Sequence, residues 1–307
     1  MGTGNQGRNG RIVLLPHPGA EAIPTDGAAN VPWNTGQHRR KFLECEGAYV
    51  RNGGVAPQVA TLRFWCEYEP PTAVTTLRQG HQPPRYLHRI VRWPSTVVQS
   101  GSGNGCTPRG GCQNTDPWIW REGFVWTICR HHQSGKLRRL VRELKSGDLI
   151  LFGSPSKTRW LLDTVLVVGE GLPKPMAYAT VRANNKDPLY AAAVLDLLAP
   201  SSLALMPIHG QSQRAVGASG PFSFVPSARA ADQTWFERPD IADLVHKLTK
   251  SNGGAKPALN SAQSATECLF PDGPSAFWRL VVDQVASAGL VMGTQFDFPI
   301  AVHGSET

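Results

Sequence analysis

The segment 136–168 constrains the fold more than any other, because it reads as a helix followed by two strands. Residues 136–145 place apolar side chains at the spacing of one helix face. These apolar residues are Leu137, Leu140, Val141 and Leu144. The other faces carry basic residues, namely Arg138, Arg139, Arg142 and Lys145. Gly147 follows where we expect the helix to end, since glycine adopts positive φ without strain.

Two strand-like runs follow this helix, at 149–152 and 160–168, with a Gly/Ser/Pro/Lys loop between them. We therefore expect a basic amphipathic helix that leads into a β-hairpin. Asp163 lies inside the second apolar run, LLDTVLVV, where a carboxylate needs a partner or a strand bulge. Both a structural and a catalytic role are compatible with this position.

The remaining periodicities indicate an α+β protein with a mixed, largely antiparallel sheet and flanking helices. In the strand expected at 61–68, Leu62 and Phe64 share one side, while Arg63, Trp65 and Glu67 share the other. Residues 24–37 and 79–117 are expected as loops, because both are rich in Gly and Pro. Further strands are expected at 11–15, 201–208, 222–225 and 290–298, and helices at 190–198, 241–248 and 275–289.

Positive charge is concentrated in the first part of the chain. The net charge is +8; residues 1–170 carry 21 Lys and Arg against 12 Asp and Glu, whereas 171–307 carry 10 against 11. We divide the chain into a basic, Trp-rich, β-rich region, 1–170, and an α/β region, 171–307, packed on it as one compact unit. The asymmetry indicates an anionic partner, with nucleic acid as the leading candidate. Solubility alone is the alternative explanation.

Several classes of protein are disfavoured. The chain has no apolar run of the ~20 residues that a membrane span needs, and no secretory signal, so we expect a cytoplasmic protein without a membrane partner. The six cysteines are scattered, which predicts free thiols rather than a disulfide scaffold or a zinc site. We predict no metal, and no cofactor or oligomeric state is indicated. Phosphate-loop, dinucleotide-binding, HExxH and GxSxG motifs are missing.

A first group of candidate residues lies near the N-terminus. It comprises His17, Glu21, Trp33, Asn34, His38, Arg40 and Lys41. Histidine and carboxylate together supply acid–base chemistry near neutral pH. Trp33 and Asn34 are candidates to contact a base or substrate, and Arg40 and Lys41 to contact phosphate. Hydrogen bonds that only stabilise loops are the alternative.

A second group is Glu67 and Glu69, which a strand places on one face beside Trp65. The neighbouring indole could raise one carboxyl pKa for general-acid catalysis. Two exposed carboxylates at the edge of a sheet are the alternative.

A third group lies before and within the aromatic run at 118–126. Asn114 and Asp116 precede Trp118 and Trp120. Amides read base edges and aromatic rings stack on bases, whereas an Asx turn before a strand explains the same residues structurally. The basic helix is the fourth group, with Arg138, Arg139 and Arg142 as phosphate contacts or as an ordinary solvated face.

The segment SGDLILFGS…RWLLDTVLVV resembles the core of PUA-like barrels, including the ASCH and EVE groups. In addition, HPGAE, PWN-x-G-x-H-x-R-K-F, FWCEYEP and QNTDP resemble motifs of uncharacterised bacterial proteins associated with nucleotide modification. The barrel resemblance covers about thirty residues. It implies a partly closed barrel that binds RNA or modified DNA bases, with an aromatic pocket for a flipped base.

These observations predict a nucleic-acid-binding protein that recognises or processes a modified base. Trp65, Trp118 and Trp120 would stack on the base, Asn114 and Asp116 would read or act on it, and the helix arginines would hold phosphates. An alternative is an enzyme that acts on a free nucleotide or another small anionic substrate through His17, Glu21, His38, Glu67 and Glu69. A second alternative is a protein-interaction module whose basic face binds an acidic partner.

Overall fold

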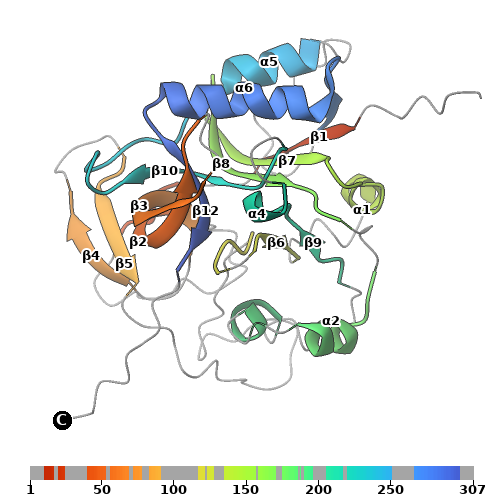
Figure 1. Ribbon diagram of the computed structural model, residues 1–307, viewed down its shortest axis with the longest axis horizontal. Coiled ribbons are helices and arrows are strands. Elements are labelled where there is room, and N and C mark those ends of the chain that lie inside the picture. The colour runs from red at the N-terminus through yellow and green to blue at the C-terminus, as the bar shows by residue number, and fades with distance from the viewer. Residues whose placement is uncertain are drawn as a thin grey trace, which may run out of the picture.

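A computed structural model shows an α+β architecture with two large sheets, a two-stranded sheet of β6 and β9, and flanking helices (Figure 1). The structure describes residues 10–16, 20–24, 40–52, 56–68, 72–77, 83–90, 117–121, 123–127, 135–156, 158–170, 175–185, 187, 190–195, 205–216, 220–250 and 266–297. Among these residues no helix is both long and apolar enough to cross a membrane.

The strands account for most of the regular structure. They are β1 (Arg11–Pro16), β2 (Arg40–Val50), β3 (Gln58–Glu67), β4 (Thr72–Thr76), β5 (Tyr86–Ile90), β6 (Val125–Trp126), β7 (Leu149–Ser156), β8 (Arg159–Val167), β9 (Ile208–His209), β10 (Val225–Arg229), β11 (Thr266–Leu269) and β12 (Val291–Phe296). The helices are α1 (Gly135–Arg142), α2 (Tyr178–Asn184), the π-helical turn η2 (Ala191–Leu195), α4 (Gln213–Val216), α5 (Ala242–Lys250) and α6 (Gly273–Ser287).

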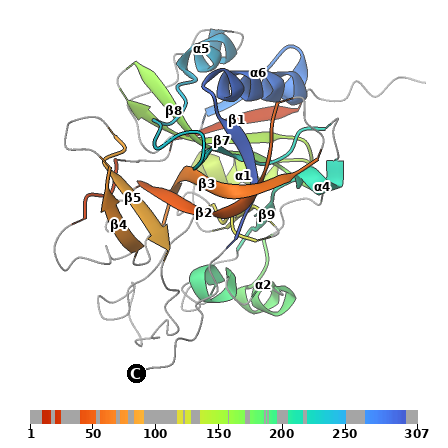
Figure 2. The ribbon, with the colours of Figure 1, turned by 60° about the vertical axis from the view of Figure 1, so that its left-hand side comes forward.

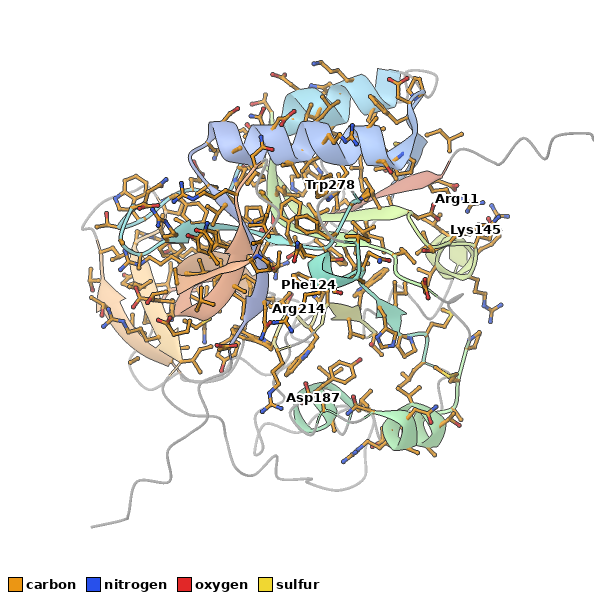
Figure 3. All side chains as sticks on the ribbon, in the orientation of Figure 1. Arg11, Phe124, Lys145, Asp187, Arg214 and Trp278 are labelled. Carbon is orange, nitrogen blue, oxygen red and sulfur yellow. The ribbon has the colours of Figure 1, made fainter. Side chains whose placement is uncertain are left out.

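The first sheet has the order β11-β1-β7-β8 and contains the expected hairpin, β7 paired antiparallel with β8. Strand β1 lies parallel to β7 and antiparallel to β11. Helices α5 and α6 cover this sheet (Figure 1). Helix α6 buries Phe277, Val281 and Val285, and its Trp278 Nε1 donates to the carbonyl oxygen of Phe222 at 2.9 Å (Figure 3).

The second sheet has the order β12-β10-β3-β2-β5-β4, and an additional β12–β2 pairing joins four of its strands into a closed antiparallel ring. Strands β4 and β5 extend this ring outward (Figure 2). Gly47 permits closure, because a Cβ atom there would lie 2.5 Å from the carbonyl oxygen of Gln295 on β12. The expectation of a largely antiparallel α+β fold with a barrel and flanking helices is confirmed.

Strand β3 separates two hydrophobic cores, as its alternating sequence predicts. Leu62, Phe64 and Cys66 belong to a core that extends to α1 and β7, whereas Trp65 belongs to the core that contains Phe42 and the buried residues of α5 and α6. Strands from both halves of the chain share both sheets, since β11 joins β1 and β7 while β10 and β12 join β2 and β3.

Several expected elements differ from the structure. Helix α1 ends at Arg142 rather than at Gly147, because the next two amides bond three residues back and Asp148 accepts the amide of Lys145 at 2.8 Å. Gly147, at φ 88°, forms the turn into β7 instead. The region expected as a loop at 79–117 contains β5, and β2 and β4 were not expected. Within 201–208 only Ile208 belongs to a strand of the described residues, and the strand expected at 222–225 begins at Val225.

Candidate functional site

A buried charge cluster lies between the two sheets. Arg40, on β2, donates from its Nη1 atom to Glu67 on β3 at 2.8 Å and from its Nε atom to Asp163 on β8 at 3.1 Å. All three side chains are at most 3% exposed. Such a group of charges is tolerated away from water only because each charge has an opposite partner.

Arg238 completes this cluster from the segment that precedes α5. Its Nη1 atom donates to Asp163 Oδ1 and to the hydroxyl of Ser154, both at 2.7 Å. Its guanidinium carbon lies 5.5 Å from the centre of the Trp65 ring, within the range of a cation–π interaction. We call Arg40, Glu67, Asp163 and Arg238 the buried charge cluster; it has two positive and two negative side chains.

The carboxylates stabilise the charge of Arg40. Burial opposes the charge, but Asp163 and Glu67 outweigh it and raise the pKa of Arg40 above its ordinary value. Burial also raises the pKa of the neighbouring Cys66 thiol, which therefore stays protonated. A void of about 10 Å³ lies between Arg40, Glu67 and Asp163, close to the space that one water needs.

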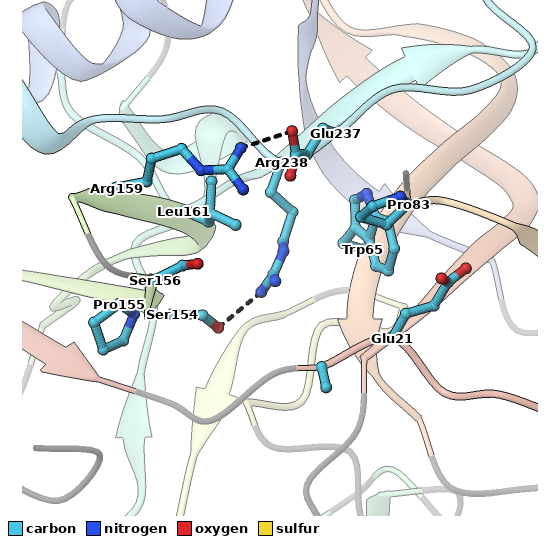
Figure 4. A pocket seen from close by; sticks show the side chains of 11 residues that line it. Glu21, Trp65, Pro83, Ser154, Pro155, Ser156, Arg159, Leu161, Glu237 and Arg238 are labelled. Atoms are coloured by element: carbon cyan, nitrogen blue, oxygen red, sulfur yellow. Dashed lines mark hydrogen bonds and ion pairs between the residues drawn. The ribbon is translucent and has the colours of Figure 1, made fainter. Parts of the chain in front are cut away.

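A cavity of about 320 Å³ adjoins the cluster on the side of Arg238. Figure 4 shows that Arg238 crosses it, with the β7–β8 hairpin at one end and Trp65, Pro83 and Glu21 at the other. The residues that line it are Ala20, Glu21, Trp65, Pro83, Ser154, Pro155, Ser156, Arg159, Leu161, Glu237 and Arg238. Its volume lies at the lower end of the range for small-molecule pockets.

The two carboxylates of the cavity differ in their surroundings. Glu21 is 4% exposed and accepts the amides of Arg85 and Tyr86 and the Nε atom of Arg85, so it holds the segment beside Pro83 in place. Glu237 is 35% exposed and accepts Arg159 Nη1 at 2.8 Å across the cavity wall (Figure 4).

Four residues expected to be functional come together here. Glu21 and Trp65 line the cavity, and Arg40 and Glu67 form the cluster behind it. Glu67 is not an exposed carboxylate at a sheet edge, because Arg40 covers it. The Arg40 guanidinium lies between two carboxylates, which differs from the expected contact with phosphate. Trp65 donates from Nε1 to the carbonyl oxygen of Phe236 at 3.1 Å and is 3% exposed.

Other expected residues lie elsewhere. Trp118 and Trp120 are 2% and 0% exposed and pack against Tyr190 and Phe64, so their rings contribute to the core. Lys41 lies over the ring of Tyr68. The remaining expected residues, His17, Trp33, Asn34, His38, Glu69, Asn114 and Asp116, lie outside the described residues.

The basic helix stands at the other end of the β7–β8 hairpin. Arg139 and Arg142 are exposed there, and Arg138 belongs to the same helix. Seven steps of β7, at about 3.3 Å each, separate Leu149 near α1 from Ser156 at the cavity, or about 23 Å. A small ligand in the cavity therefore does not reach these arginines, whereas an extended polyanion can contact both places.

The sequence signals reach only part of this site. The apolar run around Asp163 predicted a partner or a strand bulge, and the structure shows both, since Arg40 and Arg238 donate to the carboxylate and the β7–β8 register shifts at this residue. Arg238, Ser154, Arg159 and Glu237 carried no such signal, since an arginine or serine in a polar segment is ordinary. The described residues contain no group of three or more His, Cys, Asp or Glu side chains that could hold a metal ion.

Comparison with protein-family models, with curated proteins and with solved structures found no match. The function of the chain is therefore inferred from the site itself.

Proposed function

We propose that this protein binds nucleic acid and receives one flipped base, of a modified nucleotide, in the cavity beside Arg238. The observation that carries this proposal is the cation–π pair of Trp65 and Arg238 on the wall of a cavity of about 320 Å³. Arginine guanidinium planes and aromatic rings are the groups on which proteins stack unpaired bases.

The contacts of Arg238 support its role as a platform for a base. Its bonds to Asp163 and Ser154 fix the guanidinium, so little side-chain freedom is lost when a ligand stacks on it. Flipping a base costs a few kcal/mol, and stacking returns about 1–3 kcal/mol per base. Hydrogen bonds to the cavity wall and phosphate contacts provide the remainder.

The position of the basic helix supports nucleic acid rather than a free nucleotide. A nucleic-acid strand that places one base in the cavity can extend its backbone toward Arg139 and Arg142, past the far end of β7, whose seven steps span about 23 Å. Each phosphate contact releases counterions, so binding by such a surface weakens steeply with salt.

The test is binding of labelled single- and double-stranded DNA and RNA, with plain and modified bases, at several salt concentrations. We expect the logarithm of affinity to fall linearly with the logarithm of salt concentration, and the double variant Arg139→Ala/Arg142→Ala to reduce the slope by up to about 2. Arg279→Ala, which removes an exposed arginine on α6, is the matched control and should leave the slope unchanged.

A second variant tests the cavity. Ser156 is half-buried at its edge, and Ser156→Trp should fill the space and abolish any preference for a modified base while the salt slope stays. Absence of salt-dependent binding to all of these nucleic acids overturns the proposal.

The second candidate function is an enzyme that acts on a free nucleotide. The small-molecule size of the cavity and the partly exposed carboxylate of Glu237 favour it. It predicts turnover of a mononucleotide, measured by chromatography of the products, that Arg139→Ala/Arg142→Ala leaves unchanged. The nucleic-acid proposal predicts instead that the same double variant loses affinity for DNA or RNA.

A further inference from the structure

The hairpin end of the cavity has a different chemistry from its aromatic end. Ser154, Ser156 and Arg159 line this end together with Arg238, so two hydroxyls and two guanidinium groups face one space (Figure 4). The opposite end holds Trp65, Pro83 and the Glu21 carboxylate, whose bonds to Arg85 and Tyr86 already occupy it.

Strand geometry explains why these side chains share a face. Side chains two residues apart on a strand point to the same side, so Ser154 and Ser156 of β7 point together. Ser156 is directly opposite Arg159 in the β7–β8 register, and Ser154 is opposite Leu161. Leu161 and Asp163 follow Arg159 on the same face of β8, which leads from the cavity into the buried charge cluster.

The Arg159–Glu237 ion pair is open to competition. Both side chains are partly exposed, at 44% and 35%, and an ion pair in that setting is weak. A terminal phosphate carries more charge than a carboxylate and offers three oxygens, and a backbone phosphodiester offers one charge on two free oxygens, so either can pair with the fork of an arginine. A ligand phosphate can therefore replace Glu237 as the partner of Arg159.

We infer that this end of the cavity is a phosphate subsite, in which Arg159 and the Ser156 hydroxyl bind the phosphate of the nucleotide whose base lies against Arg238. This inference deepens the proposed function, on which it rests for the identity of the base. The phosphate comes either from the backbone beside a flipped base or from a free mononucleotide. Glu237 competes with it for Arg159.

The competition gives two variants opposite effects. Arg159→Ala removes a charged donor, so we expect the affinity for a nucleoside 5′-monophosphate to fall about tenfold. Glu237→Gln removes the competing carboxylate, so we expect the same affinity to rise by a few-fold. Asp232→Asn, which alters the exposed pair of Asp232 with Arg229 on β10, is the matched control and should have no effect.

The measurement is isothermal titration calorimetry of the full chain with inorganic phosphate, the common deoxyribonucleoside 5′-monophosphates and the corresponding nucleosides, after thermal unfolding has shown that each variant is folded. We expect tighter binding of a monophosphate than of its nucleoside, and no effect of Arg159→Ala on the nucleoside. The phosphate subsite is overturned by equal affinity for a nucleoside and its monophosphate, or by a Glu237→Gln change that weakens monophosphate binding as Arg159→Ala does. Failure of inorganic phosphate and of every monophosphate to bind also overturns it.

The same experiments separate this inference from the proposed function. Salt-dependent binding of an oligonucleotide that Arg159→Ala does not weaken, with no preference for monophosphates, overturns the subsite and leaves the proposed function standing. Binding of a monophosphate through Arg159 without any binding of DNA or RNA does the reverse, and identifies the free mononucleotide as the source of the phosphate.

Discussion

Arg40 and His88 are buried basic side chains on neighbouring strands of one sheet, and they differ in whether they carry charge. Both are at most 2% exposed. Burial opposes the charge of each, but Asp163 and Glu67 raise the pKa of Arg40, whereas burial and nearby Lys41 lower the pKa of His88 from its ordinary 6.5 to about 4. A guanidinium is far more basic than an imidazole and is charged in either setting; the carboxylates stabilise that charge in Arg40, whereas burial is the main cause that lowers the pKa of His88.

The carboxylate partners in the buried charge cluster also position one residue of the cavity wall. Because Arg238 donates to Asp163, its side chain is held in place beside Trp65 on the cavity wall. The side of the sheet around His88 offers a neutral imidazole, whose Nδ1 atom lies 2.8 Å from the Thr72 hydroxyl. The charged side chains of the buried charge cluster thus lie between the two large sheets, away from His88.

The largest expected effect comes from removing the carboxylate that Arg40 and Arg238 share. Asp163→Asn leaves two buried guanidinium groups with reduced compensation, so we expect the free energy of unfolding to fall by about 3–5 kcal/mol. Urea denaturation measures this loss. Asp243→Asn, an exposed change on α5, is the control and should stay within about 0.5 kcal/mol of the parent protein. An unchanged urea midpoint for Asp163→Asn would show that the cluster does not need this charge.

The second effect concerns His88 and pH. Its pKa is lower in the folded chain, so below 6.5 the unfolded chain binds the extra proton first and stability is lost as pH falls. The loss begins near pH 6.5, is complete near pH 4, and amounts to about 3 kcal/mol. Denaturation at pH 7 and at pH 4.5 should show a smaller difference for His88→Gln than for the parent protein. A parallel pH dependence in the two proteins contradicts the assignment to His88.

A third change tests the packing of the β7–β8 hairpin, which carries Asp163, without altering charge. Gly153 on β7 lies against Trp160, and a Cβ atom there would come within 2.2 Å of the indole ring. We expect Gly153→Ala to cost about 1–3 kcal/mol, because the ring must move. Gly123→Ala adds the same methyl group where no atom lies within 4 Å and should be close to neutral in thermal unfolding. Equal stability of the two variants would mean that Trp160 repacks without cost.

The smallest effect is expected at the exposed counterpart of the cluster. Arg11 contacts Glu143 and Glu267 at 2.8 and 3.1 Å at the start of β1, close to Lys145 (Figure 3). Glu267 is 37% exposed, so Glu267→Gln should cost less than about 1 kcal/mol and less still in high salt. A loss as large as that of Asp163→Asn would remove the distinction between buried and exposed pairs.

Apolar residues at a regular spacing were enough to predict the helices and strands that bury one face. The alternation in β3, the β7–β8 hairpin, α5, α6 and the final strand follow from apolar residues at fixed spacing. The solitary carboxylate of Asp163 in an apolar run also predicted a partner or a strand bulge, because an unpaired buried charge is costly.

The partners of Asp163 and the position of the cavity depend on contacts between elements that are far apart in the sequence. Arg238 is 75 residues from Asp163 along the chain, and Arg40 is 123 residues from it. Strand β2, which the sequence interpretation did not identify, pairs with β3, β5 and β12 and places Arg40 in the buried charge cluster. Local spacing predicts which side of an element is buried, but contacts between distant elements depend on how the sheets pack, and the candidate site consists of such contacts.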